Sequence, residues 1–316
     1  FLVVGAGRAF VNREREMPGK FLMVVLALCL TACDSPQQAV LDVAMAPPTE
    51  QTDITFIVAG KTSNHRQSLS GEVSVLNFHF FAEVFLQSDG EAQDSSLETP
   101  LSQGVRIPFA DSGYALEMHG GRYKSEAELE AAYPDGDYIF RYDAPSIGAV
   151  SQVVTLGNPN ATGSGIPKAP QIYLNQNGKS VAPDNIDPQQ DLRVTWSEFS
   201  AGDADPLGIV DDLLFVIMGD CDGVRRAHSG RPFENTPYLT YADESFVIDA
   251  SRLLPENVYQ LSVEHAVLDT TLEHNVPAFA TYATSTFLDI RTTGEAEPGT
   301  ACHSIRKKFD AGQAVL

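Results

Sequence analysis

Short runs that alternate between apolar and polar residues constrain the fold of this chain more than any other feature. They begin near Asp53, and Gly, Pro, Asp or Ser bounds each run. Successive side chains of a β-strand point to opposite faces, so a period of two is typical of strands with one buried face. These runs predict an antiparallel β domain over residues 53–156. They are "DITFIVAG", "GEVSVLNFHFFAEVFLQ", "GVRIPFA", "YALEM" and "DYIFRYDA".

One stretch inside this domain has a helical signature. In "KSEAELEAAYPDGD", Ser125 and Glu128 have the spacing of a capping box, and the Pro, Asp and Gly at its end favour termination. We therefore predict a short helical insertion. The next segment, "GNPNATGSGIPKAP", is dense in Gly, Pro and Asn, so residues 157–167 are expected to link this domain to a second one.

A second β domain is predicted over residues 168–294, followed by a tail of residues 295–316. The strand "DLRVTWSEF" contains the single tryptophan, Trp196, and "LLPENVYQLSV" places Tyr259 where a tyrosine corner would bond back to the backbone. With a closing strand in "STFLDIRTTG", this order resembles a fibronectin type III or related immunoglobulin-like sandwich. The resemblance implies a scaffold for adhesion or spacing rather than a particular chemistry.

The expected fold class is thus all-β, with two β-sandwich-like domains in tandem. The second domain is expected to be fibronectin type III-like or immunoglobulin-like, and the first to carry the short helical insertion.

The N-terminal region has the features of an export signal. In "MPGKFLMVVLALCLTACDS", one lysine precedes a short apolar run and small residues precede Cys33. The last four residues up to Cys33 resemble the lipobox of bacterial lipoproteins, which implies lipidation of Cys33. Residues 1–32 are then an upstream segment with a signal peptide, and residues 33–52 are a tether. In that family an aspartate such as Asp34 favours the inner membrane, facing the periplasm; the alternative is an ordinary secretory signal.

The cysteines favour one disulfide. Cys29 would be removed with the signal and Cys33 would carry lipid, so Cys221 and Cys302 remain in an oxidising compartment. In the sandwich that the chain resembles, the strands preceding these two cysteines end at the same pole, which allows a bridge. Two free thiols are the alternative.

The formal net charge of −21 disfavours nucleic acid as a partner and favours cations. Asp203, Asp205 and Asp211 have part of the spacing of a calcium loop, although Leu207 and Leu214 occupy two of its ligand positions. In the sandwich this loop would lie beside a loop of residues 269–280. Asp269 and Glu273 would then complete a calcium shell. The alternative is an acidic turn before a buried strand.

Sequence motifs for catalysis are weak in this chain. "AGKT" lacks the first glycine and the following helix of a phosphate-binding loop, and neither a G-x-S-x-G elbow nor an H-E-x-x-H motif occurs. His265 and His274 each directly follow a glutamate and could in principle bind a metal or act as a base, but scattered histidines are more often structural. A glycosidase carboxylate pair is assembled by the fold and leaves no sequence motif.

The expectation that follows is a lipid-anchored cell-envelope module for binding or adhesion, without catalytic residues that the sequence can name. Its partners would be the membrane, through the lipid, and a glycan or envelope-protein ligand. A carbohydrate-active hydrolase of the envelope and a structural spacer are the alternatives.

Overall fold

The computed structural model describes residues 53–87, 90–113, 115–157 and 166–306. The chain divides into a unit of residues 1–45 and a unit of residues 46–316, and all the described residues belong to the second. The predicted signal peptide, Cys33 and the tether up to residue 52 lie outside the described residues, as does most of the predicted linker. Among the described residues, no helix is long and apolar enough to cross a membrane.

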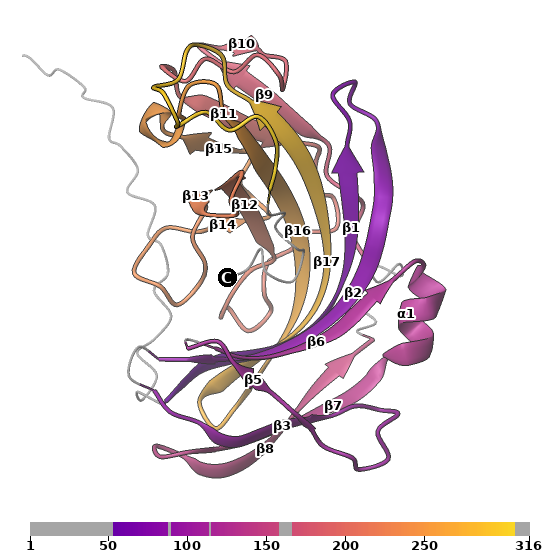
Figure 1. The fold of residues 1–316 in the computed structure, drawn as a ribbon. Coiled ribbons are helices and arrows are strands. Elements are labelled where there is room, and N and C mark those ends of the chain that lie inside the picture. Colours follow the sequence, from indigo (N-terminus) through magenta and orange to yellow (C-terminus); the bar gives the residue numbers. More distant parts are fainter. Residues whose placement is uncertain (1–52, 88–89, 114, 158–165, 307–316) are drawn as a thin grey trace, which may run out of the picture. The chain divides into compact units, whose positions relative to one another are not determined.

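The described residues form an all-β fold with one short α-helix and one 3-10 helix (Ala250–Arg252), which confirms the predicted all-β class with a short helical insertion (Figure 1). Nine strands form one long sheet in the order β13-β12-β16-β17-β1-β2-β6-β5, with β14 pairing to β12. The bounds are β1 (Ile54–Gln67), β2 (Val73–Leu86), β5 (Ala110–Asp111), β6 (Ala115–Tyr123), β12 (Leu213–Asp220), β13 (Arg225–His228), β14 (Leu239–Thr240), β16 (Val258–Glu273) and β17 (Val276–Arg291).

Two four-stranded sheets accompany the long one. Their orders are β4-β3-β7-β8 and β10-β9-β11-β15. The bounds of the first are β3 (Gln93–Glu98), β4 (Ile107–Pro108), β7 (Gly136–Ala144) and β8 (Gly148–Leu156); those of the second are β9 (Ile172–Gln176), β10 (Lys179–Ser180), β11 (Leu192–Trp196) and β15 (Ser245–Ile248).

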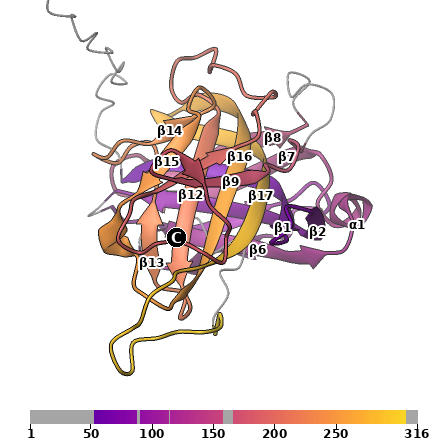
Figure 2. The same cartoon turned by 90° about the horizontal axis from the view of Figure 1, so that it is seen from above.

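The long sheet joins strands from both predicted β domains. β1 pairs with β17 in parallel, from Ile57 opposite Ala278 to Arg66 opposite Phe287. Figure 2 shows β1 and β2 beside β16 and β17. Strands from residues 53–156 and from residues 168–294 therefore share one sheet, a pairing that the alternating pattern does not specify.

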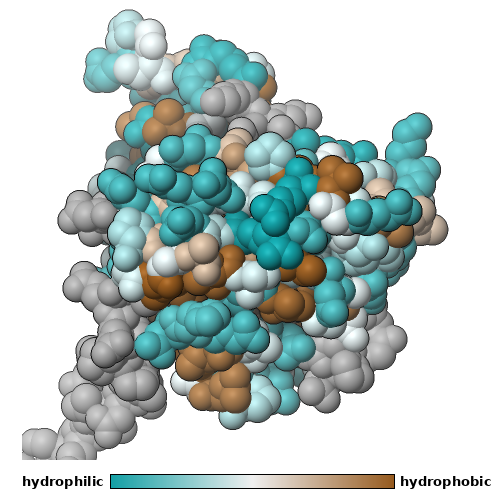
Figure 3. All heavy atoms as spheres, turned by 90° about the horizontal axis from the view of Figure 1, so that it is seen from below, coloured by the Kyte–Doolittle hydropathy of each residue, from teal (hydrophilic) through white to brown (hydrophobic). Residues whose placement is uncertain are grey.

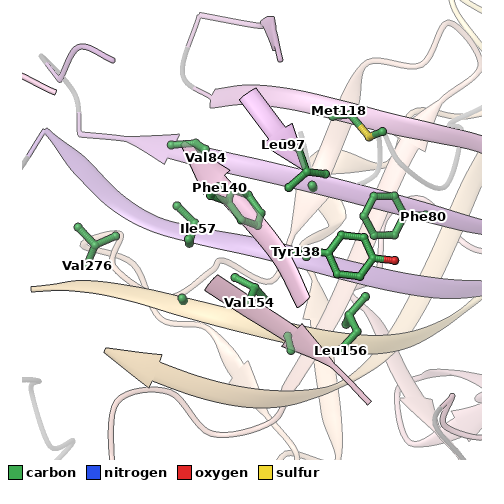
Figure 4. Close-up of a cluster of buried hydrophobic side chains, with 14 of the residues drawn as sticks. Ile57, Phe80, Val84, Leu97, Met118, Tyr138, Phe140, Val154, Leu156 and Val276 are labelled. Carbon is green, nitrogen blue, oxygen red and sulfur yellow. The ribbon is translucent and has the colours of Figure 1, made fainter. Parts of the chain in front are cut away.

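Both small sheets cover the same face of the long sheet at different places. In β17, Ala280 and Tyr282 belong to the first apolar core, whereas Leu288 and Ile290 belong to the second. All four are even-numbered positions of one strand, so they lie on one face. The first core includes Ile57, Phe80, Val84, Tyr138 and Phe140 (Figure 4). This packing is sandwich-like in both halves.

Helix α1 (Glu126–Ala132) begins and ends as predicted. Ser125 Oγ accepts a hydrogen bond from the backbone N–H of Glu128, and Glu128 Oε2 accepts one from the N–H of Lys124. Beneath the helix, the fully buried Lys61 donates to Glu130 and, over 2.6 Å, to Asp135 Oδ1. These two ion pairs satisfy the buried ammonium group and attach the helical segment to β1.

The disulfide between Cys221 and Cys302 is present, with a Cα–Cα distance of 6.4 Å. It attaches part of the predicted tail to the sheet, where Val258 N–H also donates to Cys302 O over 2.9 Å. The predicted contact of the tyrosine corner is also found. The hydroxyl of the buried Tyr259 accepts a hydrogen bond from Leu254 N–H over 2.6 Å.

The predicted loop of residues 269–280 is wrong. β16 continues to Glu273 and β17 starts at Val276, so only His274 and Asn275 form the turn. Their φ angles are 53° and 59°, as a two-residue hairpin turn requires, because its left-handed residues match the twist of the strands.

Candidate functional site

The aspartates of the predicted calcium loop bind the backbone of their own loop. The Asp205 carboxylate accepts hydrogen bonds from the N–H groups of Leu207, Ile209 and Val210 over 3.1, 2.7 and 3.1 Å. Asp211 Oδ1 accepts from Asp205 N–H over 2.9 Å. These oxygens therefore hold the turn that leads into β12.

Asp203 and the neighbouring Asp212 complete this backbone network. Asp203 Oδ1 accepts from Ala204 N–H over 2.8 Å. Asp212 Oδ2 accepts from Asp203 N–H over 2.8 Å, while its Oδ1 accepts from Leu268 N–H on β16 over 2.6 Å. Burial raises the pKa of Asp212 to about 6, against the effect of these hydrogen bonds.

The predicted partners from the second loop lie on β16. Burial, together with the charge of Asp205, raises the pKa of Asp269, so these two carboxylates lie near each other. Glu273 is at the far end of β16, beside the hairpin turn. Within the described ranges, no group of three or more His, Cys, Asp or Glu side chains is placed to hold a metal ion. The arrangement thus gives no support to the expected calcium shell.

A polar cluster that the sequence analysis missed lies on the opposite face of the long sheet from the two small sheets. Glu83 on β2 is directly opposite Glu117 on β6. Glu83 is 1 % exposed and Glu117 is 8 % exposed. Burial, with the charges of Glu117 and Glu264, raises the pKa of Glu83, and the charge of Arg231 opposes them; the resulting pKa is about 8. Glu83 is therefore largely protonated at neutral pH.

Arg231 connects this cluster to the surface. Its guanidinium group lies over the ring of Phe85, 5.5 Å from the centroid, and pairs with Glu234 Oε1 over 2.9 Å. On β16, Glu264 accepts a hydrogen bond from Ser285 Oγ, and burial raises its pKa. Arg231 is thus the cation whose charge opposes the raised pKa of Glu83.

Two histidines extend the cluster along β2 and β6. His79 Nδ1 donates to Gly121 O over 2.7 Å, because a carbonyl oxygen only accepts. His79 Nε2 lies 3.4 Å from His119 Nδ1, and His119 Nε2 lies 3.4 Å from Glu117 Oε2. Polar contacts therefore run from Gly121 O through both histidines to Glu117.

The cluster could have been noticed as charged residues inside alternating strands. Glu83 lies between Ala82 and Val84, which face the first core. On the face that Glu83 itself occupies, its neighbours two residues away are Phe81 and Phe85, and these apolar neighbours predict that this face is buried as well. In this conformation Glu83 and Glu117 are too little exposed for a substrate to reach them, so the cluster is a network within the protein rather than an open reaction site.

An open hollow lies next to Arg231. It has a volume of about 490 Å³, within the range of small-molecule sites. The segment from the end of β13 to β15 forms it, and its walls include His228, Glu234, Thr236, Tyr238, Leu239 and Phe246.

The surroundings of His228, in the wall of this hollow, determine which of its ring nitrogens carries a proton. Its Nδ1 accepts a hydrogen bond from Gly230 N–H over 3.0 Å. Burial, together with the charges of Arg225 and Arg231, lowers the pKa of His228 to about 4, so the ring is neutral at physiological pH. A neutral imidazole that accepts at Nδ1 carries its proton on Nε2, which is left as a donor.

Figure 3 shows apolar patches interrupted by polar side chains on the face seen from below.

The sequence was compared with protein-family models and with curated proteins, and neither comparison finds a match.

Proposed function

We propose that this chain is a lipid-anchored binding module of the bacterial cell envelope, and that it binds a saccharide in the hollow between β13 and β15. The observation that carries the proposal is the composition of that hollow. Tyr238 and Phe246 are half-buried aromatic side chains, and Glu234 and Thr236 are exposed polar ones. A sugar ring has the complementary surface, because its C–H groups pack on aromatic rings while its hydroxyls need donors and acceptors.

The polar groups of the hollow are oriented before any ligand arrives. Arg231 holds Glu234 through the 2.9 Å ion pair, which positions a carboxylate as a hydroxyl acceptor. His228 Nε2 is the complementary donor, because Gly230 occupies Nδ1. Fixed polar groups reduce the entropy that is lost when a ligand binds.

The location is part of the same proposal. The apolar run before Cys33 supports export and lipidation, and the disulfide is consistent with an oxidising compartment. Tyr259 and its bond to Leu254 support the fibronectin type III-like or immunoglobulin-like assignment of the C-terminal half. A module of this kind would present its hollow to glycans or glycosylated partners near the membrane.

A glycan array probed with the full-length protein in detergent micelles tests the proposal. We expect a defined set of glycans to bind without being cleaved. Tyr238→Ala should weaken that binding more than tenfold. Tyr173→Ala, which removes an exposed tyrosine on β9, should leave it unchanged.

Other results of the same experiment favour the alternatives. Cleavage of a bound glycan would support a carbohydrate-active hydrolase. A lack of binding to every glycan on the array would support a structural spacer. Equal losses in the two tyrosine variants would place the ligand elsewhere.

A further inference from the structure

A second hollow, of about 280 Å³, lies beside His265 of β16. Pro167 and Lys168 before β9 form one side, and Glu198, Phe199 and Ala201 after β11 form another. Backbone pairing fixes both sides, since Ser197 N–H donates to Gln171 O over 2.9 Å. Thr284, the cross-strand neighbour of His265, donates its hydroxyl to Pro167 O over 2.5 Å.

His265 lines this hollow with an unsatisfied nitrogen. The residue is 1 % exposed, and its ring stacks on Phe199 with centroids 4.4 Å apart. Its Nε2 is buried and has no hydrogen-bond partner among the described residues. Leaving a buried polar atom unpaired is costly, and a phenylalanine would fill the same stacked position without that cost. A ligand that forms a hydrogen bond with Nε2 would offset the cost of this unpaired nitrogen, which gives the imidazole a function that phenylalanine lacks.

The rim of the hollow carries one charge of each sign. Lys168 and Glu198 are both exposed there. A ligand with a single charge is attracted by one of them and repelled by the other, whereas a ligand with both charges can satisfy both. The formal charge of −21 further disfavours a simple anion. Pro167, Phe199 and Ala201 offer apolar contacts.

We propose that this hollow is a binding site for a small zwitterion, a free α-amino acid with an apolar side chain. Lys168 binds the carboxylate, Glu198 binds the ammonium group, and His265 pairs with a polar atom of the ligand. The site is separate from the proposed saccharide hollow and does not depend on it.

Isothermal titration calorimetry with the full-length protein tests this assignment. The probes are leucine, 4-methylpentanoate, which lacks the ammonium group, and isoamylamine, which lacks the carboxylate. We expect leucine to bind, and each singly charged analogue to bind more than tenfold more weakly. Absence of heat with all three probes overturns the proposal. Equal affinity for leucine and one analogue also overturns it, because the site would then not recognise one of the two charges of leucine.

Variants locate the binding. His265→Phe keeps the stacking on Phe199 and the fold, so its melting temperature should be unchanged or higher while leucine affinity falls more than tenfold. Lys168→Met should also weaken leucine binding, whereas Lys179→Met, at an exposed lysine of β10, should not. Unchanged leucine affinity in a folded His265→Phe protein rejects the site.

Discussion

Glu83 on β2 and Glu117 on β6 are directly opposite each other, and both are buried on the face of the long sheet that lies away from the two small sheets. Two carboxylates so close in a poorly solvated environment do not both ionise readily, and the pKa of Glu83 is raised to about 8. The pair also lies near Arg231 and is continued by His119 and His79. The stability of the protein should therefore depend on pH through Glu83.

We expect Glu83→Gln to stabilise the protein at alkaline pH. In the wild type, keeping an ionisable carboxyl group buried at Glu83 costs unfolding free energy once that group ionises in the unfolded state. This cost is absent below the unfolded pKa of 4.5, because Glu83 is protonated in both the folded and the unfolded state. It grows as pH rises from 4.5 to about 8, since the unfolded state ionises first, and it amounts to at most about 5 kcal/mol. Urea unfolding from pH 5 to pH 8 should show a flatter profile for Glu83→Gln, and the wild-type slope for Glu244→Gln, at an exposed glutamate. Parallel profiles for all three proteins would contradict the raised pKa.

The disulfide should contribute substantially to stability. It joins residues 81 apart in sequence, for which the loop-closure model gives roughly 4 kcal/mol. The double variant Cys221→Ala, Cys302→Ala should lose up to that amount in denaturant unfolding. Dithiothreitol should destabilise the wild type and leave the double variant unaffected. Two separately alkylated thiols in a non-reduced digest would show that the protein lacks the bridge.

Asp205 should stabilise the loop that contains Asp203 and Asp211, and this effect should not require calcium. Its carboxylate accepts three backbone hydrogen bonds, so Asp205→Ala leaves three donors unpaired and should cost about 1–3 kcal/mol. Asp203→Ala removes one acceptor and should cost less. Both effects, measured by thermal unfolding, should be the same in calcium and in chelator. A rise in melting temperature with calcium that Asp203→Ala abolishes would instead support the metal site.

Cys33 should attach the protein to the membrane. Cys33→Ala removes the thiol that would be acylated, so we expect the precursor to escape processing by the lipoprotein signal peptidase and the lipid label to disappear. Cys29→Ala changes a cysteine within the predicted signal and should be processed normally. Incorporation of labelled fatty acid, followed by fractionation, distinguishes the two. Label retained by Cys33→Ala would refute lipidation at this position.

Local interactions explain what the sequence alone determined. Alternating residues specify strands because each side chain's face depends only on its position in the strand. Ser125 predicts the start of α1 because a cap contacts residues within one turn. The contact of Tyr259 with Leu254 spans five residues, and the pairing of Cys221 with Cys302 followed from the small number of cysteines.

Long-range packing decided the rest. The parallel pairing of β1 with β17 joins segments about 220 residues apart, and an alternating pattern does not identify a strand's neighbour. That pairing places Glu83 and Glu264 in the same sheet, where Arg231 approaches from a separate segment. The pKa of Glu83 and the hollows at His228 and His265 arise from this arrangement, because burial and proximity are properties of the packed chain and not of any one segment.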